Sequence, residues 1–190
     1  MKTKGGIFIF SGPSGCGKST VLARVMEAHE KSFFSVSATT RAPRAGEQNG
    51  VNYLFLSKDE FEKMLEEDAF LEHAEYVGNY YGTPKAPVIE HSDAGEDVIL
   101  DIEVQGAEQV MAKLPEAVSV FIAPPSLEEL ERRLRGRSSE TEESIRKRLL
   151  RAEAELPLSK NYDHVVINDS LDDTVQQILD IINKSKTERS

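Results

Sequence analysis

The sequence lacks the residues and segments that define several large classes of protein. Its 190 residues include a single cysteine, Cys16, so an internal disulfide and a cysteine-based zinc site are both excluded. The four histidines do not have the spacing of metal ligands. No apolar run approaches the roughly 20 residues of a membrane-spanning helix. The apolar stretch near the N-terminus breaks at Ser11-Gly12-Pro13 and is a poor signal peptide, so the expected compartment is the cytoplasm.

Positive charge is also scarce. Lysine and arginine together number 23 against 33 acidic residues, which gives a formal net charge of −10. A chain this acidic is a poor match for the phosphate backbone of nucleic acids. Basic residues gather between Glu131 and Arg151, and acidic residues between Lys58 and Glu75. Solvated helix faces are the simplest interpretation of either run taken alone.

Short apolar runs alternate with helical patterns along most of the chain. The expected strands are 6–10, 33–37, 53–56, 70–76, 80–81, 98–102, 118–122 and 165–167, and the expected helices are 19–30, 57–67, a short one after Pro84, 105–113, 126–135, 142–155 and one from 171. This alternation predicts an α/β fold with a mainly parallel sheet. Residues 33–82, with closely spaced strands and one helix, predict an inserted mixed lobe. The polar tail from Lys184 is expected to fray.

One segment carries a specific chemical pattern. Residues 12–19, GPSGCGKS, match G-x-x-x-x-G-K-[ST] between a buried strand and a helix, as a phosphate-binding loop (P-loop) requires. Its glycines let backbone N–H groups converge on phosphate oxygens, and the helix N-terminus adds partial positive charge. Lys18 is expected to reach the β- and γ-phosphates, and Ser19 to ligate Mg²⁺. Cys16 is interpreted as a small loop residue, and a more acidic thiol, favoured by the nearby helix N-terminus, is a secondary hypothesis. The alternative interpretation of residues 12–19 as a whole is a glycine-rich turn that binds no ligand.

Residues 35–53 suit the binding of a second phosphate group. Arg41 and Arg44 lie three residues apart in a loop, and arginine favours bidentate phosphate recognition. The hydroxyl groups of Tyr53, Tyr80 and Tyr81 add possible donors. Half-buried packing in a strand is the alternative interpretation for each tyrosine.

Two carboxylates have positions that fit nucleotide chemistry. Glu72 could accept parallel hydrogen bonds from N1–H and N2–H₂ of guanine, a donor pair that adenine lacks. Asp101 ends the apolar run Val98-Ile99-Leu100, where an acid assists Mg²⁺ beside a P-loop. The alternative for Glu72 is an ordinary surface acid, and the alternative for Asp101 is a carboxylate that ends a strand and has no special role.

These motifs together resemble the guanylate kinases. The segments that carry the resemblance are SGPSGCGKST at 11–20, SVSATTRAPR at 35–44, Gly46-Glu47, Asn49-Gly50, GNYYGT at 78–83, LDI at 100–102, Gln105-Gly106, PPS at 124–126 and TEES at 141–144. The likeness runs from about Gly6 to Leu179. It implies the reaction ATP + GMP ⇌ ADP + GDP with Mg²⁺, on GMP and also dGMP. It further implies one domain over 1–190: a P-loop NTPase core (1–37, 84–125 and 157–190), a GMP-binding lobe (about 38–83) and a helical lid (about 126–156).

The resemblance also implies roles for individual residues. On the ATP side these are Gly12, Pro13, Ser14, Gly15, Cys16, Gly17, Lys18, Ser19 and Thr20, with Asn168 near the adenine. The GMP phosphate would be held by Ser37, Arg41, Arg44, Tyr53 and Tyr81, and guanine would be read by Glu72, Thr83 and Glu103. Catalysis would use Lys18, Arg41, Arg137 and Arg148, and Mg²⁺ would be held by Ser19 and, through water, Asp101.

This sequence departs from the family pattern at Glu103, where the family typically has an aspartate that also touches guanine. The exact contact of the longer acid is therefore left open. Thr83 replaces a common serine and keeps the hydroxyl group. The other lid arginines, which are Arg132, Arg133, Arg135 and Arg151, are expected to be mostly surface or salt-bridged. The expected partners are small molecules, with no nucleic acid and no membrane, for a monomer or weak homo-oligomer.

Three other functions compete with this interpretation. A kinase for AMP, dTMP or another monophosphate would share the P-loop, but Glu72 and Glu103 suit the donors of guanine. A guanylate-kinase-like scaffold domain that binds phosphopeptides would share the fold, but such domains have damaged phosphate loops, and Lys18 is present here. A P-loop hydrolase without an acceptor would have no use for residues 35–53.

Overall fold

The computed structural model describes residues 4–76, 78–136 and 141–189. Within these ranges the central sheet has five strands in the order β2-β7-β1-β8-β9, and every neighbouring pair is parallel. The strands are β1 (Ile7–Ser11), β2 (Ser32–Phe34), β7 (Asp97–Asp101), β8 (Val118–Ala123) and β9 (His164–Ile167). The predicted α/β fold with a parallel sheet is confirmed.

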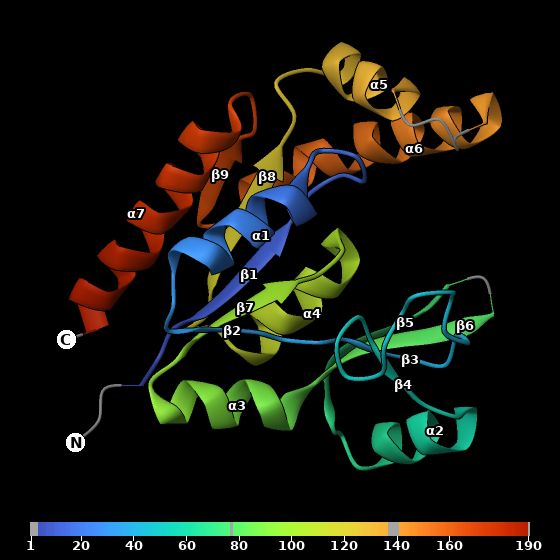
Figure 1. Ribbon diagram of the computed structural model, residues 1–190, viewed down its shortest axis with the longest axis vertical. Coiled ribbons are helices and arrows are strands. Elements are labelled where there is room, and N and C mark those ends of the chain that lie inside the picture. The colour runs from blue at the N-terminus through green and yellow to red at the C-terminus, as the bar shows by residue number, and fades with distance from the viewer. Residues whose placement is uncertain (1–3, 77, 137–140, 190) are drawn as a thin grey trace.

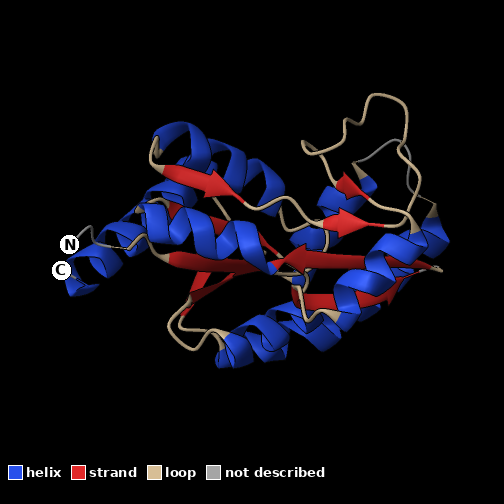
Figure 2. Ribbon diagram, turned by 90° about the horizontal axis from the view of Figure 1, so that it is seen from below, coloured by secondary structure: helices blue, strands red, loops and turns tan. Residues whose placement is uncertain are grey.

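Helices cover both faces of this sheet (Figures 1 and 2). They are α1 (Lys18–Ala28), α3 (Lys85–Ala94), α4 (Val104–Lys113) and α7 (Leu171–Arg189). Side chains of β1 alternate between two cores: Ile7 and Ile9 pack with residues of α3 and α4, whereas Phe8 and Phe10 pack with α1 and α7. This explains the uninterrupted apolar run, because a strand buried on both faces has no solvent side. None of the described helices is long and apolar enough to cross a membrane.

A second, mixed sheet forms the predicted lobe. Its order is β4-β3-β6-β5, with β3 parallel to β4 and antiparallel to β6. The elements are β3 (Ala38–Thr39), β4 (Leu54–Phe55), α2 (Lys58–Glu66), β5 (Phe70–Tyr76) and β6 (Asn79–Pro84). The side chain and backbone of Ser57 form the predicted capping box with Glu60 at the start of α2. Ala38, Phe61 and Phe70 are the buried centre of a separate small core.

The predicted lid range contains α5 (Leu127–Arg135) and α6 (Glu142–Glu155), which continues into a 3₁₀ segment, η1 (Leu156–Asn161). The two helices pack against each other through Leu130, Leu134, Ile145 and Ala152. Side-chain oxygens of Ser126 and Thr141 cap the starts of the two helices. Arg137, a predicted catalytic residue, falls within 137–140 and lies outside the described residues. The division into core, lobe and lid stays a prediction.

Some expected elements differ from the structure. The prediction that the tail frays from Lys184 is wrong, because α7 is helical to Arg189. The helix after Pro84 is a full ten residues rather than short. The strand expected at 33–37 is divided: β2 ends at Phe34, and the chain pairs next at Ala38 in the other sheet. The η1 segment was not expected, because Pro157 at its start reads as a helix stop in the sequence.

A buried aspartate explains why α7 remains ordered. Asp97, 2% exposed at the start of β7, accepts a hydrogen bond from the Gly6 backbone N–H at 2.7 Å. Its other carboxylate oxygen lies 2.8 Å from Nε2 of His29 and 2.9 Å from Nζ of Lys186 on α7. Burial by itself would raise the pKa of Asp97, but the hydrogen bonds from Gly6, Lys186 and His29 together lower it. The carboxylate therefore ties the last turns of α7 to the sheet.

Replacing Asp97 by asparagine is expected to lower the free energy of unfolding by about 3 kcal/mol at pH 7, because a buried ion pair loses its acid. Since the folded-state pKa is below its ordinary value of 3.8, this contribution is complete at neutral pH and is lost as the pH falls through that lowered value. The difference between wild type and variant, measured by urea unfolding, should therefore shrink below about pH 4. Asp93→Asn, which removes the exposed partner of Lys4, should change little. A pH-independent difference would contradict the role given to the Asp97 charge.

Candidate active site

The loop between β1 and α1 wraps around a cavity of about 320 Å³. All nine residues predicted on the ATP side of this loop line the cavity: Gly12, Pro13, Ser14, Gly15, Cys16, Gly17, Lys18, Ser19 and Thr20. Two of its glycines are required by close contacts. A Cβ on Gly12, whose φ is +152°, would lie 2.1 Å from the carbonyl oxygen of Ile122, and one on Gly17 would lie 2.5 Å from Nδ2 of Asn168.

Lys18 and Asp101 meet at the carboxyl end of the sheet. Asp101, the last residue of β7, is opposite Phe10 of β1. Its Oδ1 lies 2.6 Å from Nζ of Lys18, which also donates to the carbonyl oxygen of Ile102 at 3.1 Å. The P-loop lysine is thus held beside the predicted magnesium acid.

The donor atoms in this cavity fit magnesium. Ser19 and Asp101 both line it, and a hydroxyl and a carboxylate oxygen are ligands that Mg²⁺ accepts. Among the described residues there is no cluster of three or more metal-ligating side chains.

Cys16 does not have the acidic thiol that its position suggested. Its side chain is fully buried in the core with α1 and α7, and burial, the largest effect, raises the pKa of the thiol despite the nearby charge of Lys18. The predicted acidity is therefore wrong. The backbone of Cys16 makes polar contacts: its N–H donates to the carbonyl oxygen of Pro13 at 3.1 Å, and its carbonyl oxygen accepts from residues distant in sequence.

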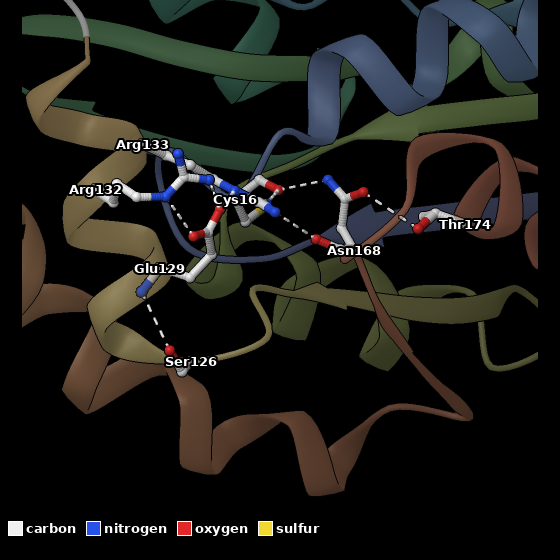
Figure 3. A network of polar contacts seen from close by, with 7 residues as sticks. All are labelled: Cys16, Ser126, Glu129, Arg132, Arg133, Asn168 and Thr174. Atoms are coloured by element: carbon white, nitrogen blue, oxygen red, sulfur yellow. Dashed lines mark hydrogen bonds and ion pairs between the residues drawn. The ribbon is translucent and has the colours of Figure 1, made fainter.

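That carbonyl is the centre of the network in Figure 3. It accepts hydrogen bonds from Nδ2 of Asn168 at 2.7 Å and from Nη1 of Arg133 at 3.2 Å. Arg133 also donates to the carbonyl oxygen of Asn168 at 2.9 Å and to Glu129 at 2.8 Å. Thr174 donates to Oδ1 of Asn168 at 3.2 Å. Asn168 therefore supports the P-loop from behind, and Arg133 attaches α5 to the same point.

A second cavity, of about 280 Å³, lies beside the lobe. Among the predicted GMP-side residues, its lining includes Ser37, Tyr53, Glu72, Tyr81 and Glu103.

Glu72 is the buried acid of this cavity. It is 8% exposed and accepts a 2.7 Å hydrogen bond from Oγ1 of Thr83. Burial raises the pKa of Glu72, the Thr83 hydrogen bond opposes this, and the charge of Glu103 adds to it. A Cβ on Gly106 would lie 2.7 Å from Oε2 of Glu72, so the missing side chain leaves room for the carboxylate.

The two cavities adjoin. Tyr53, Asp101 and Glu103 line both of them. A ligand on the P-loop and a ligand beside Glu72 would therefore have their reacting ends close to the same three residues.

Comparison with known proteins decides the family. The sequence model described as guanylate kinase matches residues 4–185. The chain belongs to the guanylate kinase family. A guanylate kinase of Halalkalibacterium halodurans is 50% identical over 188 residues, which is 99% of this chain and 92% of that protein. One of Synechococcus elongatus is 50% identical over 171 residues, 90% of this chain and 93% of that protein. The predicted resemblance is confirmed.

Comparison with solved structures supports the same family assignment. The crystal structure of a guanylate kinase from Anaplasma phagocytophilum superposes with a TM-score of 0.76 at 34% identity and covers 97% of this chain and 87% of that one. A shikimate kinase from Bacteroides thetaiotaomicron, 13% identical with a TM-score of 0.51 and coverage of 94% and 98%, shares the fold alone.

Of the two arginines predicted to hold the acceptor phosphate in the guanylate kinase family, Arg41 has its guanidinium group engaged within its own loop. Arg41 forms a two-pronged pair with Glu47, at 3.0 and 2.9 Å, and lies over the ring of Tyr53. Glu47 also accepts a hydrogen bond from the backbone N–H of Arg44 at 2.7 Å, and the Arg41 hydrogen bond lowers the pKa of Glu47. Within the described part of the chain, neither arginine belongs to the lining of the two cavities. Sequence reasoning missed Glu47, although it belongs to the segments that resemble the guanylate kinases.

Two further arginines of α6 reach the site. Nη1 of Arg148 lies 2.6 Å from Oγ of Ser14 in the P-loop. Arg151, three residues on, forms ion pairs with Glu103 and Glu155 and lines the donor cavity. Arg151 was expected to be mostly surface or salt-bridged, and it is salt-bridged; its place in the cavity lining was not predicted, although its spacing from Arg148 puts both on one helix face. The same expectation holds for the other three arginines to which it applied: Arg132 and Arg133 pair with Glu129, and Arg135 pairs with Glu131 and Glu142.

Proposed function

We propose that the two adjoining cavities carry out the ATP-dependent phosphorylation of GMP to GDP, with ATP on the P-loop and GMP beside Glu72. One observation carries this proposal: the cavities share Tyr53, Asp101 and Glu103. A transferase needs such a junction, because the two substrates must meet at their phosphates, whereas a hydrolase has no use for the second cavity.

On the donor side, backbone N–H groups of the loop between Gly12 and Thr20, where only Pro13 has none to donate, would hold the ATP phosphates, with Lys18 on the β- and γ-phosphates and Asn168 near the adenine. The Lys18 ammonium, now shared by Asp101 and a carbonyl oxygen, would gain phosphate oxygens as partners. Ser19 and, through water, Asp101 would hold Mg²⁺, which supplies charge neutralisation on the phosphates when bound.

On the acceptor side, Glu72 and Glu103 would accept hydrogen bonds from guanine, and the Thr83 hydroxyl would complete base recognition. Ser37, Arg41, Arg44, Tyr53 and Tyr81 would hold the GMP phosphate. For Arg41 this requires that its guanidinium group turn from Glu47 toward the cavity. Because these assigned contacts involve base and phosphate, we expect dGMP to be accepted as well.

The chemical step requires positioning and charge neutralisation rather than proton abstraction. An oxygen of the GMP phosphate, already anionic at neutral pH, forms a bond to the γ-phosphorus of ATP. The bond from that phosphorus to the β,γ-bridging oxygen breaks, and its electron pair leaves with ADP. Lys18, Arg41 and Arg148, together with Arg137 outside the described residues, would neutralise the charge on the transferring group.

The predicted lid, 126–156, would close over the core toward the GMP-binding lobe, 38–83. This closure would exclude water from the reacting phosphates. The separate small cores of these two ranges support their movement as units. We further propose a monomer or weak homo-oligomer located in the cytoplasm.

The test of the function is an assay of ADP release with ATP and Mg²⁺, in which GMP, AMP, dTMP, UMP and CMP are offered in parallel with a blank without acceptor. Release with GMP and not with the other nucleotides or the blank is expected. Activity with a different monophosphate would overturn the reading of guanine by Glu72 and Glu103. A folded protein that binds ATP and phosphorylates none of them would instead favour the scaffold alternative.

The neighbouring arginines of α5 offer a matched pair of variants. Arg133→Gln is expected to raise KM for ATP by about tenfold, because the Cys16 and Asn168 carbonyl groups lose a charged donor. Arg132→Gln removes the same charge from a side chain that is 77% exposed and paired with Glu129, and should leave KM unchanged. Steady-state kinetics at saturating GMP measure both. Equal effects would mean that the charge of α5, and not the P-loop contact, matters.

A further inference from the structure

Arg151 lies between two carboxylates that belong to different parts of the chain. Its Nη2 forms an ion pair with Oε2 of Glu103, just before α4, and its Nε lies 2.7 Å from Oε1 of Glu155, one turn further along α6. The Glu155 side chain is 11% exposed, that of Arg151 38% and that of Glu103 73%. The inner carboxylate thus fixes the guanidinium, and the guanidinium in turn holds the outer carboxylate.

The value of this arrangement is geometric. An ion pair with a carboxylate as exposed as that of Glu103 adds little to stability, because water screens it. A glutamate side chain has three rotatable bonds, however, so without a partner its carboxylate would occupy many positions. The planar fork of Arg151 can bind both carboxylates at once and leaves the Glu103 group in one place. That place is the junction, because Glu103 lines both cavities.

The positive charge of Arg151 also affects the electrostatics of the acceptor cavity. Glu72 and Glu103 both line the acceptor cavity, and the charge of Glu103 contributes to the raised pKa of Glu72, after burial. A fixed guanidinium beside Glu103 reduces this repulsion between the two acids without removing the acceptor oxygens that guanine needs.

We propose that Arg151 is a specificity-determining positioning residue, which holds the Glu103 carboxylate at the junction for guanine and does not act on the transferring phosphoryl group. The inference rests on the proposed function. It also gives the longer acid at 103 a purpose, since the additional methylene extends the reach of its carboxylate toward Arg151. Because Arg151 belongs to α6, base recognition becomes coupled to the position of that helix.

The experiment compares Arg151→Gln, Glu103→Gln, the double variant and a control, Lys147→Gln. Lys147 lies on α6 as well, but its side chain is 73% exposed and pairs with Glu143. For each protein, kcat and the KM values for GMP and ATP are measured. The preference for GMP over inosine monophosphate, which lacks the 2-amino donor of guanine, is measured as a ratio of kcat/KM values.

Arg151→Gln is expected to raise KM for GMP about tenfold and to lower the preference for GMP over inosine monophosphate by a similar factor. It should leave kcat and KM for ATP within about twofold. The double variant should be no worse than Glu103→Gln, because Arg151 acts through Glu103. Lys147→Gln should match wild type. Should Arg151→Gln fold poorly, Arg151→Lys serves instead: it keeps the charge but not the fork, so the preference should fall while kcat is retained.

A fall in kcat with an unchanged KM for GMP would overturn the inference and place Arg151 at the transferring phosphate. Additive effects in the double variant, an unchanged preference for GMP, or a matching defect in Lys147→Gln would also overturn it. Failure of the wild-type protein to phosphorylate GMP would overturn the proposed function itself, and the inference with it.

Discussion

Replacing Lys18 by methionine is expected to reduce kcat by about 10²–10³-fold. The ammonium group of Lys18 is the single positive charge that the P-loop pattern itself supplies to the phosphates, and methionine keeps most of the length of the side chain without the charge. The effect should fall on kcat, because charge builds up on the transferring group and its leaving oxygens in the transition state. Single-turnover rates at saturating ATP and GMP measure it.

The same substitution should leave the fold nearly intact. Lys18 gives up its pair with Asp101, but the carboxylate lines an open cavity where water can replace the ammonium, so the cost in unfolding free energy should be about 1 kcal/mol. Lys184→Met, which removes an exposed lysine of α7 that is paired with Glu188, is the control and should retain full activity. A Lys18→Met protein with wild-type kcat would remove Lys18 from the mechanism.

The parts of the fold that the sequence predicts are those encoded locally. The P-loop, the capping box at Ser57 and the doubly buried β1 each depend on a few consecutive residues, and the structure confirms the local geometry of all three. The pairing of β3 with β4, by contrast, joins two-residue strands across a loop. So short a strand carries too little periodicity to be seen in sequence.

Contacts between distant residues account for what was missed in the candidate site. The pair of Arg151 with Glu103, and the bonds of Arg133 to Cys16 and Asn168, depend on how α5 and α6 pack over the core. In sequence these arginines belong to a basic run in which more than half of the residues are charged, so nothing local separates Arg133 from Arg132. The burial of Cys16 also depends on distant residues, because the core that contains its side chain includes residues of α7, the last helix in the chain.

The second large effect on catalysis is expected from a substitution of Glu72, and it concerns kcat/KM for GMP. Glu72→Gln should lower kcat/KM for GMP by about 10²–10³-fold, mainly through KM, because the amide offers guanine one acceptor oxygen and places an N–H₂ donor against another donor. Nearly complete burial of the side chain prevents water from restoring the lost bond. Glu75→Gln, on the same strand but exposed, is the matched control and should behave as wild type. An unchanged KM for GMP in Glu72→Gln would show that guanine is read elsewhere.

The pH dependence of the same KM gives an independent check. Burial raises the pKa of Glu72 above its ordinary value of 4.5, so this carboxylate takes up its proton at a higher pH than an exposed glutamate does. The protonated acid offers guanine a donor in place of an acceptor, and KM for GMP in the wild-type protein should therefore rise as the pH is lowered toward that raised pKa. In Glu72→Gln, which cannot titrate at this position, KM should be high and should lack this rise. A wild-type profile that stays flat down to the ordinary glutamate pKa would mean that ionisation of Glu72 has no part in guanine binding.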